Sequence, residues 1–498
     1  MYRPSFAEFQ ELAQKGNLVP VYREILADEE TPVTALMKIS RQPYAFLLES
    51  VEGGEKWGRY TFLGADPRAV FRVKPEGVEV HENGTVSRMS PGQNPLSCLK
   101  ELMNRYRPVS PGGLPRFFGG AVGYLSYDMV RYFEKKVSKS PASAPEVDDA
   151  VFLLTHSLLV FDNVRHTIKV VVCASVPDAQ EDLESVYRET VGRIEEIIRD
   201  LRRPAVLSGP ASGTGTESPI FRTNMHADEF KQIVRRAKEY IEQGDIIQVV
   251  LSQRFEGETR LDPIDLYRAL RFVNPSPYLF YLKMEDFHLI GSSPEVMVRL
   301  DERVAELRPI AGTRKRGSSE QEDRRLADEL LNDPKERAEH VMLVDLGRND
   351  LGRIARVGSV QVNQYMTVER YSHVMHLVSN VQAQLAEGRD CFDVLKATFP
   401  AGTLSGAPKV RAMEIIDELE PCRRGPYGGA MGYFSFSGNM DFGITIRTLV
   451  LQGNRLSLQV GAGIVADSDP DREYEETLNK AAGLMKAVNI AASGFEIM

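Results

Sequence analysis

The apolar positions along the chain follow two spacings, which predict helices and strands in groups that do not alternate regularly. Apolar residues three and four positions apart form one face of 179–201 and one face of 226–243, as in amphipathic helices. Runs of β-branched and aromatic residues predict strands, and Asn83-Gly84 is typical of a hairpin tip. Groups of strands interrupted by helices favour an α+β fold over regular βαβ winding.

The same pattern places the expected elements along the whole chain. Helices are expected at 6–15, 97–106, 179–201, 226–243, 333–347, from 391, from 406 and at 469–488. Strands are expected at 45–50, 59–64, 69–73, 78–86, 150–161, 167–174, 246–255, 279–283, 287–291, 296–300, 303–308, 358–366, 428–436, 442–451 and 455–460.

A change of composition near the middle predicts a domain boundary. Residues 205–220 are rich in Ser, Thr, Gly and Pro and are typical of a linker, which divides the chain into domains at 1–204 and 221–498. The segment GGAVGYLSY at 119–127 is echoed by GGAMGYFSF at 428–436. The echo favours similar strands in similar settings in the two halves, as duplication would produce, with chance similarity of glycine-rich strands as the alternative.

Composition excludes several classes of protein. The chain has 498 residues, 42% of them hydrophobic and 26% charged, as expected of a globular protein with a large core. A net charge of −9 argues against a nucleic-acid partner. We find no signal-peptide pattern and no apolar run long enough for a membrane span. Four dispersed cysteines without a CxxC pair predict reduced thiols in a cytoplasmic protein.

Two carboxylate pairs are the strongest candidates for chemistry. The stretches DPKERAE at 333–339 and DPDREYEE at 469–476 each open with Asp-Pro, an N-cap and first helical residue. Each then presents Glu-x-x-Glu on one helix face: Glu336 and Glu339 in one, Glu473 and Glu476 in the other. Glu336 is also placed to close a capping box. Carboxylate oxygens suit Mg²⁺, although each pair alone also fits a capped, solvated helix start.

Other polar positions carry weaker signals. The loop ATFPAGTLSGAPKVR at 397–411 and GAGIV at 461–465 could offer backbone N–H groups to an anion, or could be ordinary turns. His373 and His376 share a face only if their segment is helical. Arg447 and Lys480 could bind a carboxylate or could be surface charges.

Taken together, the motifs resemble those of the chorismate-utilising enzyme family. The resemblance covers about 225–490, with a looser likeness in the first half, and rests on NPSPY (274–278), GSSPE (291–295), RPIAGTRKRG (308–317), DPKERAEH (333–340), GTLSGAPK (402–409) and EYEET (473–477). It implies a two-layer sandwich of packed antiparallel β-sheets with helices outside. It also implies Mg²⁺-dependent conversion of chorismate and ammonia to anthranilate and pyruvate.

The resemblance assigns roles to individual residues. Glu339 and Glu476 would be the principal Mg²⁺ ligands, with Glu336 and Glu473 contributing directly or through water. Glu295 would be the general acid for the leaving hydroxyl, which requires a raised pKa. His376 would stabilise the leaving group or assist elimination. The substrate carboxylates would be bound by Gly312, Thr313, Thr403, Tyr427, Arg447, Gly461, Gly463 and Lys480.

Two positions distinguish branches of the family. Members that add water carry a lysine base where this chain has Gln248, and glutamine cannot act as a base. Aminodeoxychorismate synthases often carry a lysine in PIKGT, where this chain has Ala311. Both departures favour the anthranilate-forming branch. The alternatives are an aminodeoxychorismate synthase and a non-catalytic, ligand-binding regulatory subunit.

The resemblance also implies regulation and a partner. FLLES and NPSPY are similar to the family's tryptophan feedback site, so the inhibitor would contact Ser50, Asn274, Pro275, Ser276 and Tyr278. The chain has no glutaminase segment with a nucleophilic cysteine in a Gly-rich elbow. A separate glutamine amidotransferase subunit would therefore supply ammonia, and the protein is expected to be a hetero-oligomer.

Overall fold

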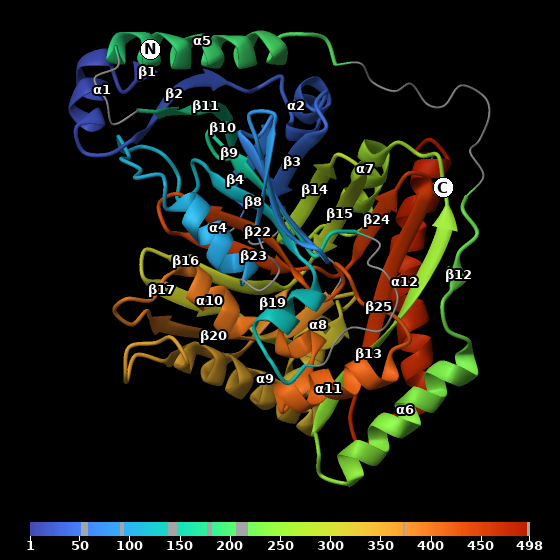
Figure 1. The fold of residues 1–498 in the computed structure, drawn as a ribbon. Coiled ribbons are helices and arrows are strands. Elements are labelled where there is room, and N and C mark those ends of the chain that lie inside the picture. The colour runs from blue at the N-terminus through green and yellow to red at the C-terminus, as the bar shows by residue number, and fades with distance from the viewer. Residues whose placement is uncertain are drawn as a thin grey trace.

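The computed structural model describes most of the chain, drawn as a ribbon in Figure 1. The described residues are 1–50, 58–89, 94–137, 147–176, 182–205, 218–371 and 374–495.

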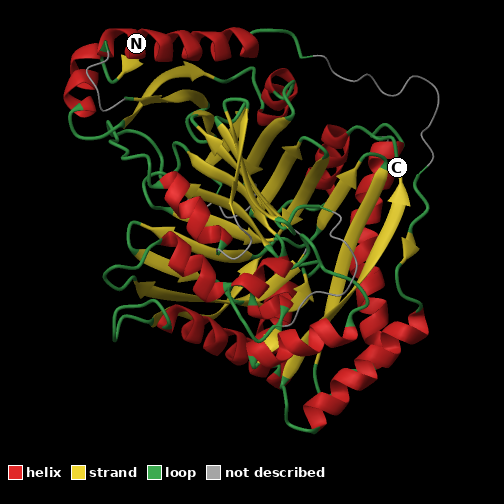
Figure 2. Cartoon of the chain, viewed as in Figure 1, coloured by secondary structure: helices red, strands yellow, loops and turns green. Residues whose placement is uncertain are grey.

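Two antiparallel β-sheets form the body of the protein (Figure 2). Among the described residues the larger sheet has 13 strands, in the order β1-β2-β11-β10-β4-β3-β14-β15-β24-β25-β13-β12 with β21 on β13. The smaller sheet has 12, in the order β18-β20-β17-β16-β23-β22-β8-β9-β5-β6-β7 with β19 on β20. The expected two-layer α+β sandwich is confirmed.

The strand bounds are as follows. The larger sheet contains β1 (Tyr2–Arg3), β2 (Leu18–Leu26), β3 (Tyr44–Glu49), β4 (Tyr60–Ala65), β10 (Ser157–Asp162), β11 (Thr167–Ser175), β12 (Arg222–Thr223), β13 (Gln248–Glu258), β14 (Tyr278–Met284), β15 (Phe287–Ser293), β21 (Gly406–Ala407), β24 (Thr448–Gln452) and β25 (Arg455–Ile464). The smaller sheet contains β5 (Ala69–Lys74), β6 (Gly77–Glu82), β7 (Thr85–Met89), β8 (Gly120–Leu125), β9 (Ala150–Thr155), β16 (Val296–Asp301), β17 (Val304–Leu307), β18 (Ile310–Lys315), β19 (Gln361–Arg370), β20 (Val374–Gln384), β22 (Ala430–Ser435) and β23 (Met440–Ile444).

Helices cover the outside of both sheets. Helices α1, α2, α5, α7 and α12 bury apolar side chains against the larger sheet, where Phe9, Leu266 and Leu484 belong to one buried cluster. Helices α8, α9 and α10 pack on strands of the smaller sheet, and α6 and α11 pack on β13. The bounds are α1 (Phe6–Ala13), α2 (Pro32–Ile39), α4 (Pro95–Met103), α5 (Leu183–Leu201), α6 (Ala227–Glu242), α7 (Pro263–Val273), α8 (Glu320–Asn332), α9 (Pro334–Gly352), α10 (Cys391–Thr398), α11 (Lys409–Leu419) and α12 (Pro470–Ala492), with 3₁₀ turns η1 (Tyr127–Tyr132) and η2 (Gly402–Leu404).

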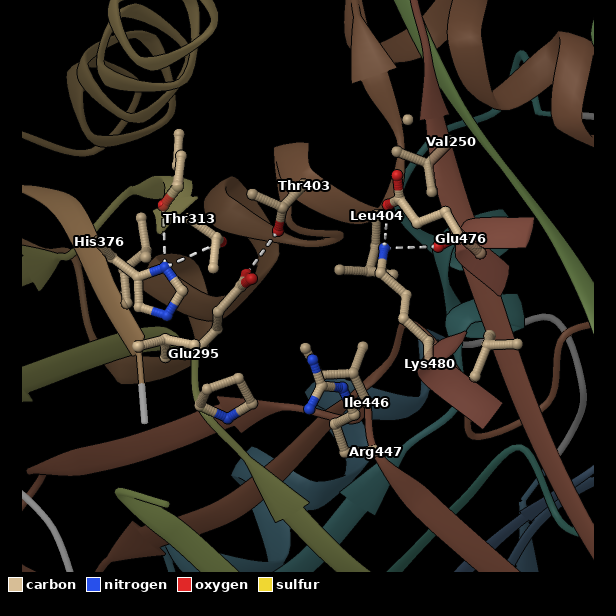
Figure 3. A pocket seen from close by; sticks show the side chains of 18 of the residues that line it. Val250, Glu295, Thr313, His376, Thr403, Leu404, Ile446, Arg447, Glu476 and Lys480 are labelled. Carbon is tan, nitrogen blue, oxygen red and sulfur yellow. Dashed lines mark hydrogen bonds and ion pairs between the residues drawn. The ribbon is translucent and has the colours of Figure 1, made fainter. Parts of the chain in front are cut away.

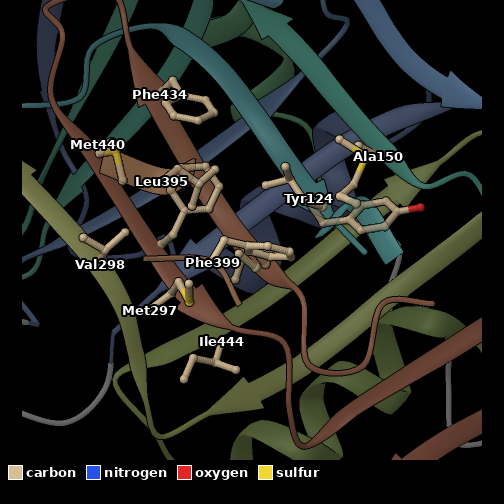
Figure 4. Close-up of a cluster of buried hydrophobic side chains, with 14 of the residues drawn as sticks. Tyr124, Ala150, Met297, Val298, Leu395, Phe399, Phe434, Met440 and Ile444 are labelled. Atoms are coloured by element: carbon tan, nitrogen blue, oxygen red, sulfur yellow. The ribbon is translucent and has the colours of Figure 1, made fainter. Parts of the chain in front are cut away.

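The main hydrophobic core is continuous through both halves of the chain. It joins side chains of both sheets with those of α4 and α10. Figure 4 shows the part where Leu395 and Phe399 approach Phe434, Met440 and Ile444. The ring of Phe392 stacks on that of Phe434 with 4.5 Å between centroids, so α10 is held against β22 by aromatic packing.

In each sheet the strands of the first half of the chain mirror those of the second half about the centre, so the strand order is palindromic. The echoed segments 119–127 and 428–436 occupy equivalent positions in this order. In the larger sheet β1, β2, β11, β10, β4 and β3 mirror β12, β13, β25, β24, β15 and β14, and in the smaller sheet β8, β9, β5 and β6 mirror β22, β23, β16 and β17. The echoed strands β8 and β22 pair with each other at the centre, with Gly123 opposite Gly432. A Cβ at either glycine would lie about 2 Å from a backbone oxygen of the neighbouring strand, at 1.9 Å for Gly123 and 2.0 Å for Gly432. Both halves therefore contribute equivalent strands to both sheets.

Apart from the two-residue strand β21, which lies in the larger sheet between β20 and β22 of the smaller one, the described chain crosses between the sheets at four places. Two of these crossings interrupt expected strands. The strand expected at 150–161 breaks at His156, between β9 and β10, and the one expected at 442–451 breaks at Arg447, between β23 and β24. Arg447 has φ of 50°, a left-handed conformation that turns the chain out of the smaller sheet. The other two crossings join β4 to β5 and β15 to β16.

Some local expectations were wrong. Gly347 does not end its helix, because α9 continues to Gly352, and the helix expected from Gly406 begins at Lys409 after the short strand β21. Helices α7 and α8 and the strand containing His376 were not predicted; that strand, β20, pairs with three others. His373 lies outside the described residues.

Candidate active site

A cavity of about 730 Å³ lies where the chain of the second half crosses between the sheets (Figure 3). Its lining comes from both crossings of that half, from the starts of α9 and α12, and from β13, β18, β20, β25 and η2. Every catalytic, substrate and metal residue predicted from the sequence lines it: Gln248, Glu295, Gly312, Thr313, Glu336, Glu339, His376, Thr403, Tyr427, Arg447, Gly461, Gly463, Glu473, Glu476 and Lys480.

The two Asp-Pro helices begin as expected and face this cavity. The side chain of Asp333 accepts hydrogen bonds from the N–H groups of the following turn in α9, and Asp469 does the same in α12. The capping box expected at Glu336 is wrong, because the Glu336 carboxylate instead pairs with Arg314 at 3.0 Å. The competing cation of β18 therefore draws Glu336 away from the helix end.

Carboxylates from the two helices repel one another across the cavity. Burial raises the pKa of Glu339, and the negative charges of Glu336 and Glu476 raise it further. Burial likewise raises the pKa of Glu473, with a further contribution from Glu476. Lys335 and Lys480 oppose both shifts. Carboxylates that resist ionisation for lack of a counter-charge favour a site that takes up a cation.

The donor set fits Mg²⁺ by its chemistry. No group of three or more His, Cys, Asp or Glu side chains in the described part of the chain is gathered closely enough to hold a metal by itself. Mg²⁺, however, is commonly held by one or two carboxylates, with waters and substrate oxygens completing the shell. Glu339 and Glu476 supply one carboxylate from each helix, and the Glu476 carboxylate pairs with Lys480 at 2.7 Å.

Glu295 has the environment of a general acid. It follows β15 at the crossing into β16, and its Oε2 accepts a hydrogen bond from the Thr403 hydroxyl at 2.8 Å. Burial raises the pKa of Glu295, while the Thr403 bond and the charges of Lys480 and Arg447 lower it. The net direction is upward, so Glu295 retains its proton to higher pH than an exposed glutamate does.

His376 is held in one tautomer. Its Nδ1 lies 2.9 Å from the carbonyl oxygen of Gly312 and 3.1 Å from the hydroxyl oxygen of Thr313. Because a carbonyl oxygen can only accept, Nδ1 carries the proton and Nε2 of the neutral ring is the acceptor. In Figure 3 His376 lies at one end of the cavity and Lys480 at the other.

Two cationic side chains, Arg447 and Lys480, also line the cavity. Arg447 is largely buried, and burial lowers the pKa of its guanidinium. The Lys480 ammonium donates to the Gly461 carbonyl at 2.8 Å, which fixes the side chain across the cavity mouth. Two cations beside a protonatable carboxyl suit an anionic substrate.

Gln248 offers an unpartnered acceptor to the cavity. Gln248 is 4% exposed, and its Oε1 has no hydrogen-bond partner among the described residues. Gly463 leaves room for this position of the side chain, because a Cβ there would lie 2.7 Å from Nε2 of Gln248. A buried amide oxygen without a donor is a natural acceptor for an N–H of a small ligand.

The residues assigned to tryptophan binding lie next to this cavity. Asn274, Pro275 and Ser276 are part of its wall. Leu279 pairs with Glu49, which brings Ser50 beside Tyr278 where β3 meets β14. Tyr278 donates to Asp441 at 2.6 Å. The segments FLLES and NPSPY therefore meet at the central strand pair of the larger sheet, β3 and β14.

Several contributors escaped the sequence analysis. Lys335 lines the cavity and opposes the raised pKa of Glu339, and its spacing of four residues from Glu339 was an available signal. Leu404 also lines the cavity and belongs to the motif GTLSGAPK, whereas Gln459 and Ile446 line it from outside the motifs that the sequence indicated. No helix among the described residues is long and apolar enough to cross a membrane.

The sequence and the fold are both similar to those of known proteins. The family model described as "chorismate binding enzyme" matches residues 43–486. Anthranilate synthase component 1 of Aquifex aeolicus is 48% identical over 99% of both chains, and that of Synechocystis sp. is 49% identical over 98% of this chain and 99% of its own length. The crystal structure of anthranilate synthase component I from Streptococcus pneumoniae TIGR4 superposes with a TM-score of 0.76 at 36% identity, covering 93% of this chain and 99% of that one.

Proposed function

Because the chain belongs to the chorismate-binding enzyme family, we propose that it is the chorismate-converting component of an anthranilate synthase. Its relatives over nearly the whole length carry that name. The reaction joins chorismate and ammonia and yields anthranilate, pyruvate and water. Nothing else is consumed. The nitrogen forms a bond to C2 of the ring as the C4 hydroxyl leaves as water, and the enolpyruvyl side chain then leaves as pyruvate.

This proposal rests mainly on one observation: Glu295 lies in the same cavity as the cations Arg447 and Lys480, whose charges act on it. Chorismate has two carboxylates and a C4 hydroxyl that must leave with a proton. Arg447 and Lys480 would bind carboxylates, and the raised pKa of Glu295 suits donation of a proton to the hydroxyl. His376, with Nε2 as acceptor, is placed to take a proton in the elimination of pyruvate or to stabilise the leaving group.

The nucleophile is supported by Gln248. Its unpartnered Oε1 would accept an N–H of ammonia and leave the nitrogen lone pair directed at C2 of the ring. An amide cannot deprotonate water, so the same position does not favour hydroxide attack.

We also propose that Mg²⁺ is the cofactor, held by Glu339 and Glu476 with Glu336 and Glu473 in direct or water-mediated support. When bound, the ion would neutralise the ring carboxylate of the substrate. The bound ion would also offset the repulsion by Glu336 and Glu476 that raises the pKa of Glu339. Glu339 and Glu476 would also orient the substrate by fixing the position of that carboxylate.

The name "component 1" supports a partner, and we propose a glutamine amidotransferase subunit that supplies ammonia in a hetero-oligomer. We propose tryptophan as a feedback inhibitor at Ser50, Asn274, Pro275, Ser276 and Tyr278. Three of these residues share the wall of the catalytic cavity, so an inhibitor there would act at short range.

Aminodeoxychorismate formation is the rival within the family, and Ala311 counts against it. Ala311 lines the cavity and is 7% exposed, so a lysine there would reach the substrate, whereas a methyl group provides no amine.

One assay separates these functions. Purified chain is incubated with chorismate, Mg²⁺ and ammonium at alkaline pH, and anthranilate fluorescence and pyruvate are both followed. Equal amounts of the two products are expected. Aminodeoxychorismate without pyruvate would support the rival, and no turnover would support a regulatory subunit.

A further inference from the structure

A buried arginine lies behind the cavity wall and contacts three of the segments that form it. Arg424, between α11 and β22, is 3% exposed and does not line the 730 Å³ cavity. Its Nη1 donates to the Leu404 carbonyl at 2.6 Å, and its Nη2 donates to the Val250 carbonyl at 2.7 Å. The guanidinium carbon lies 5.7 Å from the centre of the Tyr427 ring. Leu404, Val250 and Tyr427 all line the cavity.

The guanidinium is itself held by a buried carboxylate. Nε and Nη2 of Arg424 donate to the two oxygens of Glu420 at 2.8 and 2.6 Å. Glu420 accepts further hydrogen bonds from the N–H and the hydroxyl of Ser252, both at 2.8 Å. The Ser252 hydroxyl accepts from Gln459 at 2.8 Å, which returns the network to the cavity lining. Four of the five N–H groups of Arg424 and both carboxylate oxygens of Glu420 therefore have hydrogen-bond partners.

Such an arrangement suits positioning more than stability. A buried ion pair gives little net stability, because removing both charges from water costs about as much as their attraction returns. A planar guanidinium, however, fixes several acceptors in a rigid geometry that lysine cannot reproduce. Supporting residues of this kind keep a reacting group within a fraction of an ångström of its productive position.

The contact with Leu404 has the most direct chemical consequence. Leu404 follows Thr403 in η2, and the Thr403 hydroxyl donates to Glu295 at 2.8 Å. We propose that Arg424, oriented by Glu420, is a positioning residue that holds the η2 turn so that Thr403 keeps its hydrogen bond to Glu295. This role rests on the proposed function, in which Glu295 is the general acid.

The pH dependence of turnover should report this link. The groups that act on Glu295 are the Thr403 hydroxyl, Lys480 of α12 and Arg447 of the β23–β24 crossing, with Tyr427 facing it from the 421–427 loop and His376 across the cavity. The Thr403 hydrogen bond and the charges of Lys480 and Arg447 lower the pKa of Glu295, whereas burial raises it. Loss of the Thr403 bond therefore raises that pKa. Because the acid works when protonated, the alkaline limb of kcat should move to higher pH.

The neighbouring Arg423 provides a matched control. It is also buried, at 8% exposed, but its guanidinium pairs with Asp149 at 2.6 Å and lies 3.5 Å from Asp128, both in the first half of the chain. Among the described residues, its side chain donates to Asp149 and makes no hydrogen bond to η2 or β13. Arg423→Lys should therefore leave the alkaline limb unchanged.

The test compares Arg424→Lys, Thr403→Val, the double variant and Arg423→Lys. Chorismate turnover is measured from neutral to alkaline pH at a fixed concentration of neutral ammonia. Arg424→Lys should lower kcat about tenfold, as expected when a reacting group is misplaced, with the chorismate KM within about twofold of wild type because Arg424 does not touch the cavity. Its alkaline limb should move up, as in Thr403→Val, and the double variant should move no further.

Two results would overturn the proposal. One is a wild-type limb in Arg424→Lys while Thr403→Val moves it. The other is a full additional shift in the double variant. Should Arg424→Lys fail to fold, Glu420→Gln with Arg424→Gln removes both charges together and must show the same shift. Wild-type protein without chorismate turnover would instead contradict the proposed function, so the two failures are distinguishable.

Discussion

The two halves of the chain carry mirrored strands, yet their crossings between the sheets have opposite characters. In the second half, Glu295 lies between β15 and β16 and Arg447 between β23 and β24, and both face the 730 Å³ cavity. In the first half, Asp66 follows β4 and His156 lies between β9 and β10. These are the corresponding positions in the palindromic strand orders.

The crossings of the first half are closed or turned outward. The ring of His156 packs 5.0 Å from that of Tyr106 and 5.3 Å from that of Phe436, and among the described residues neither of its nitrogens makes a well-formed hydrogen bond. Burial lowers the pKa of His156 to about 3, so the ring is neutral. Asp66 is exposed and pairs with Arg193 at 2.8 Å. Asp66 also borders a smaller cavity of about 260 Å³, so the two halves differ in the size of the cavity at the crossing and in the charges that face it.

The largest effect should come from neutralising the acid at the crossing between β15 and β16. Glu295→Gln removes the proton donor while preserving size, so kcat should fall about 10²- to 10⁴-fold, the usual contribution of a general acid. Asp66→Asn, at the mirrored crossing, should leave kcat near wild type. Steady-state rates of anthranilate formation test both, and a comparable loss in the two variants would mean that the crossings do not differ in function.

The next effect concerns the proposed metal ligands on α12. Glu476→Gln removes a carboxylate that faces Glu339, and turnover should require at least about tenfold more Mg²⁺ or disappear. Glu475→Gln changes the neighbouring residue, which is exposed and does not line the cavity, and should retain the wild-type Mg²⁺ dependence. Near-normal activity of Glu476→Gln at ordinary Mg²⁺ would refute the ligand assignment.

A smaller effect on turnover is expected where the two halves meet at β3 and β14. Ser50→Phe should relieve tryptophan inhibition by filling the proposed inhibitor site, while kcat without tryptophan stays largely intact. Ser87→Phe on the exposed strand β7 is the control for an added aromatic ring. The measurement is turnover as a function of tryptophan concentration for each variant. If tryptophan inhibits Ser50→Phe as strongly as wild type, Ser50 is not part of the inhibitor site.

The smallest effect on activity should follow from a change at the closed crossing. In the unfolded chain His156 binds a proton near pH 6.5, whereas the folded protein binds it only near pH 3. The unfolded state thus binds more protons between these values, so the free energy of unfolding falls as pH decreases through this window. His156→Phe should remove this part of the pH dependence and leave kcat unchanged. Urea unfolding at pH 7 and pH 5 measures it; an equal loss on acidification in both proteins would contradict the account.

The sequence predicted well those features that local chemistry determines. Asp333-Pro334 and Asp469-Pro470 both start helices, because cap and proline act within one turn. The dipeptide is not sufficient by itself, since Asp262-Pro263 also starts a helix whereas Asp66-Pro67 lies between β4 and β5 and starts none. The carboxylate pairs therefore lie at the helix starts that the sequence predicted. The crossings at His156 and Arg447 were missed, since the β-rich sequences on either side read as continuous strands and only sheet pairing interrupts them. Arg424 was missed because its partners Leu404 and Val250 are distant from it in the sequence and are brought together only by the fold.

The central claim is that the open crossings of the second half bind and convert chorismate. A crystal structure with chorismate and Mg²⁺ on the Glu295→Gln variant tests it most directly, because slow turnover preserves the substrate. The account predicts chorismate in the 730 Å³ cavity, with carboxylates toward Arg447 and Lys480 and the C4 hydroxyl beside residue 295. Chorismate bound elsewhere, or with its C4 hydroxyl directed away from that residue, would contradict it.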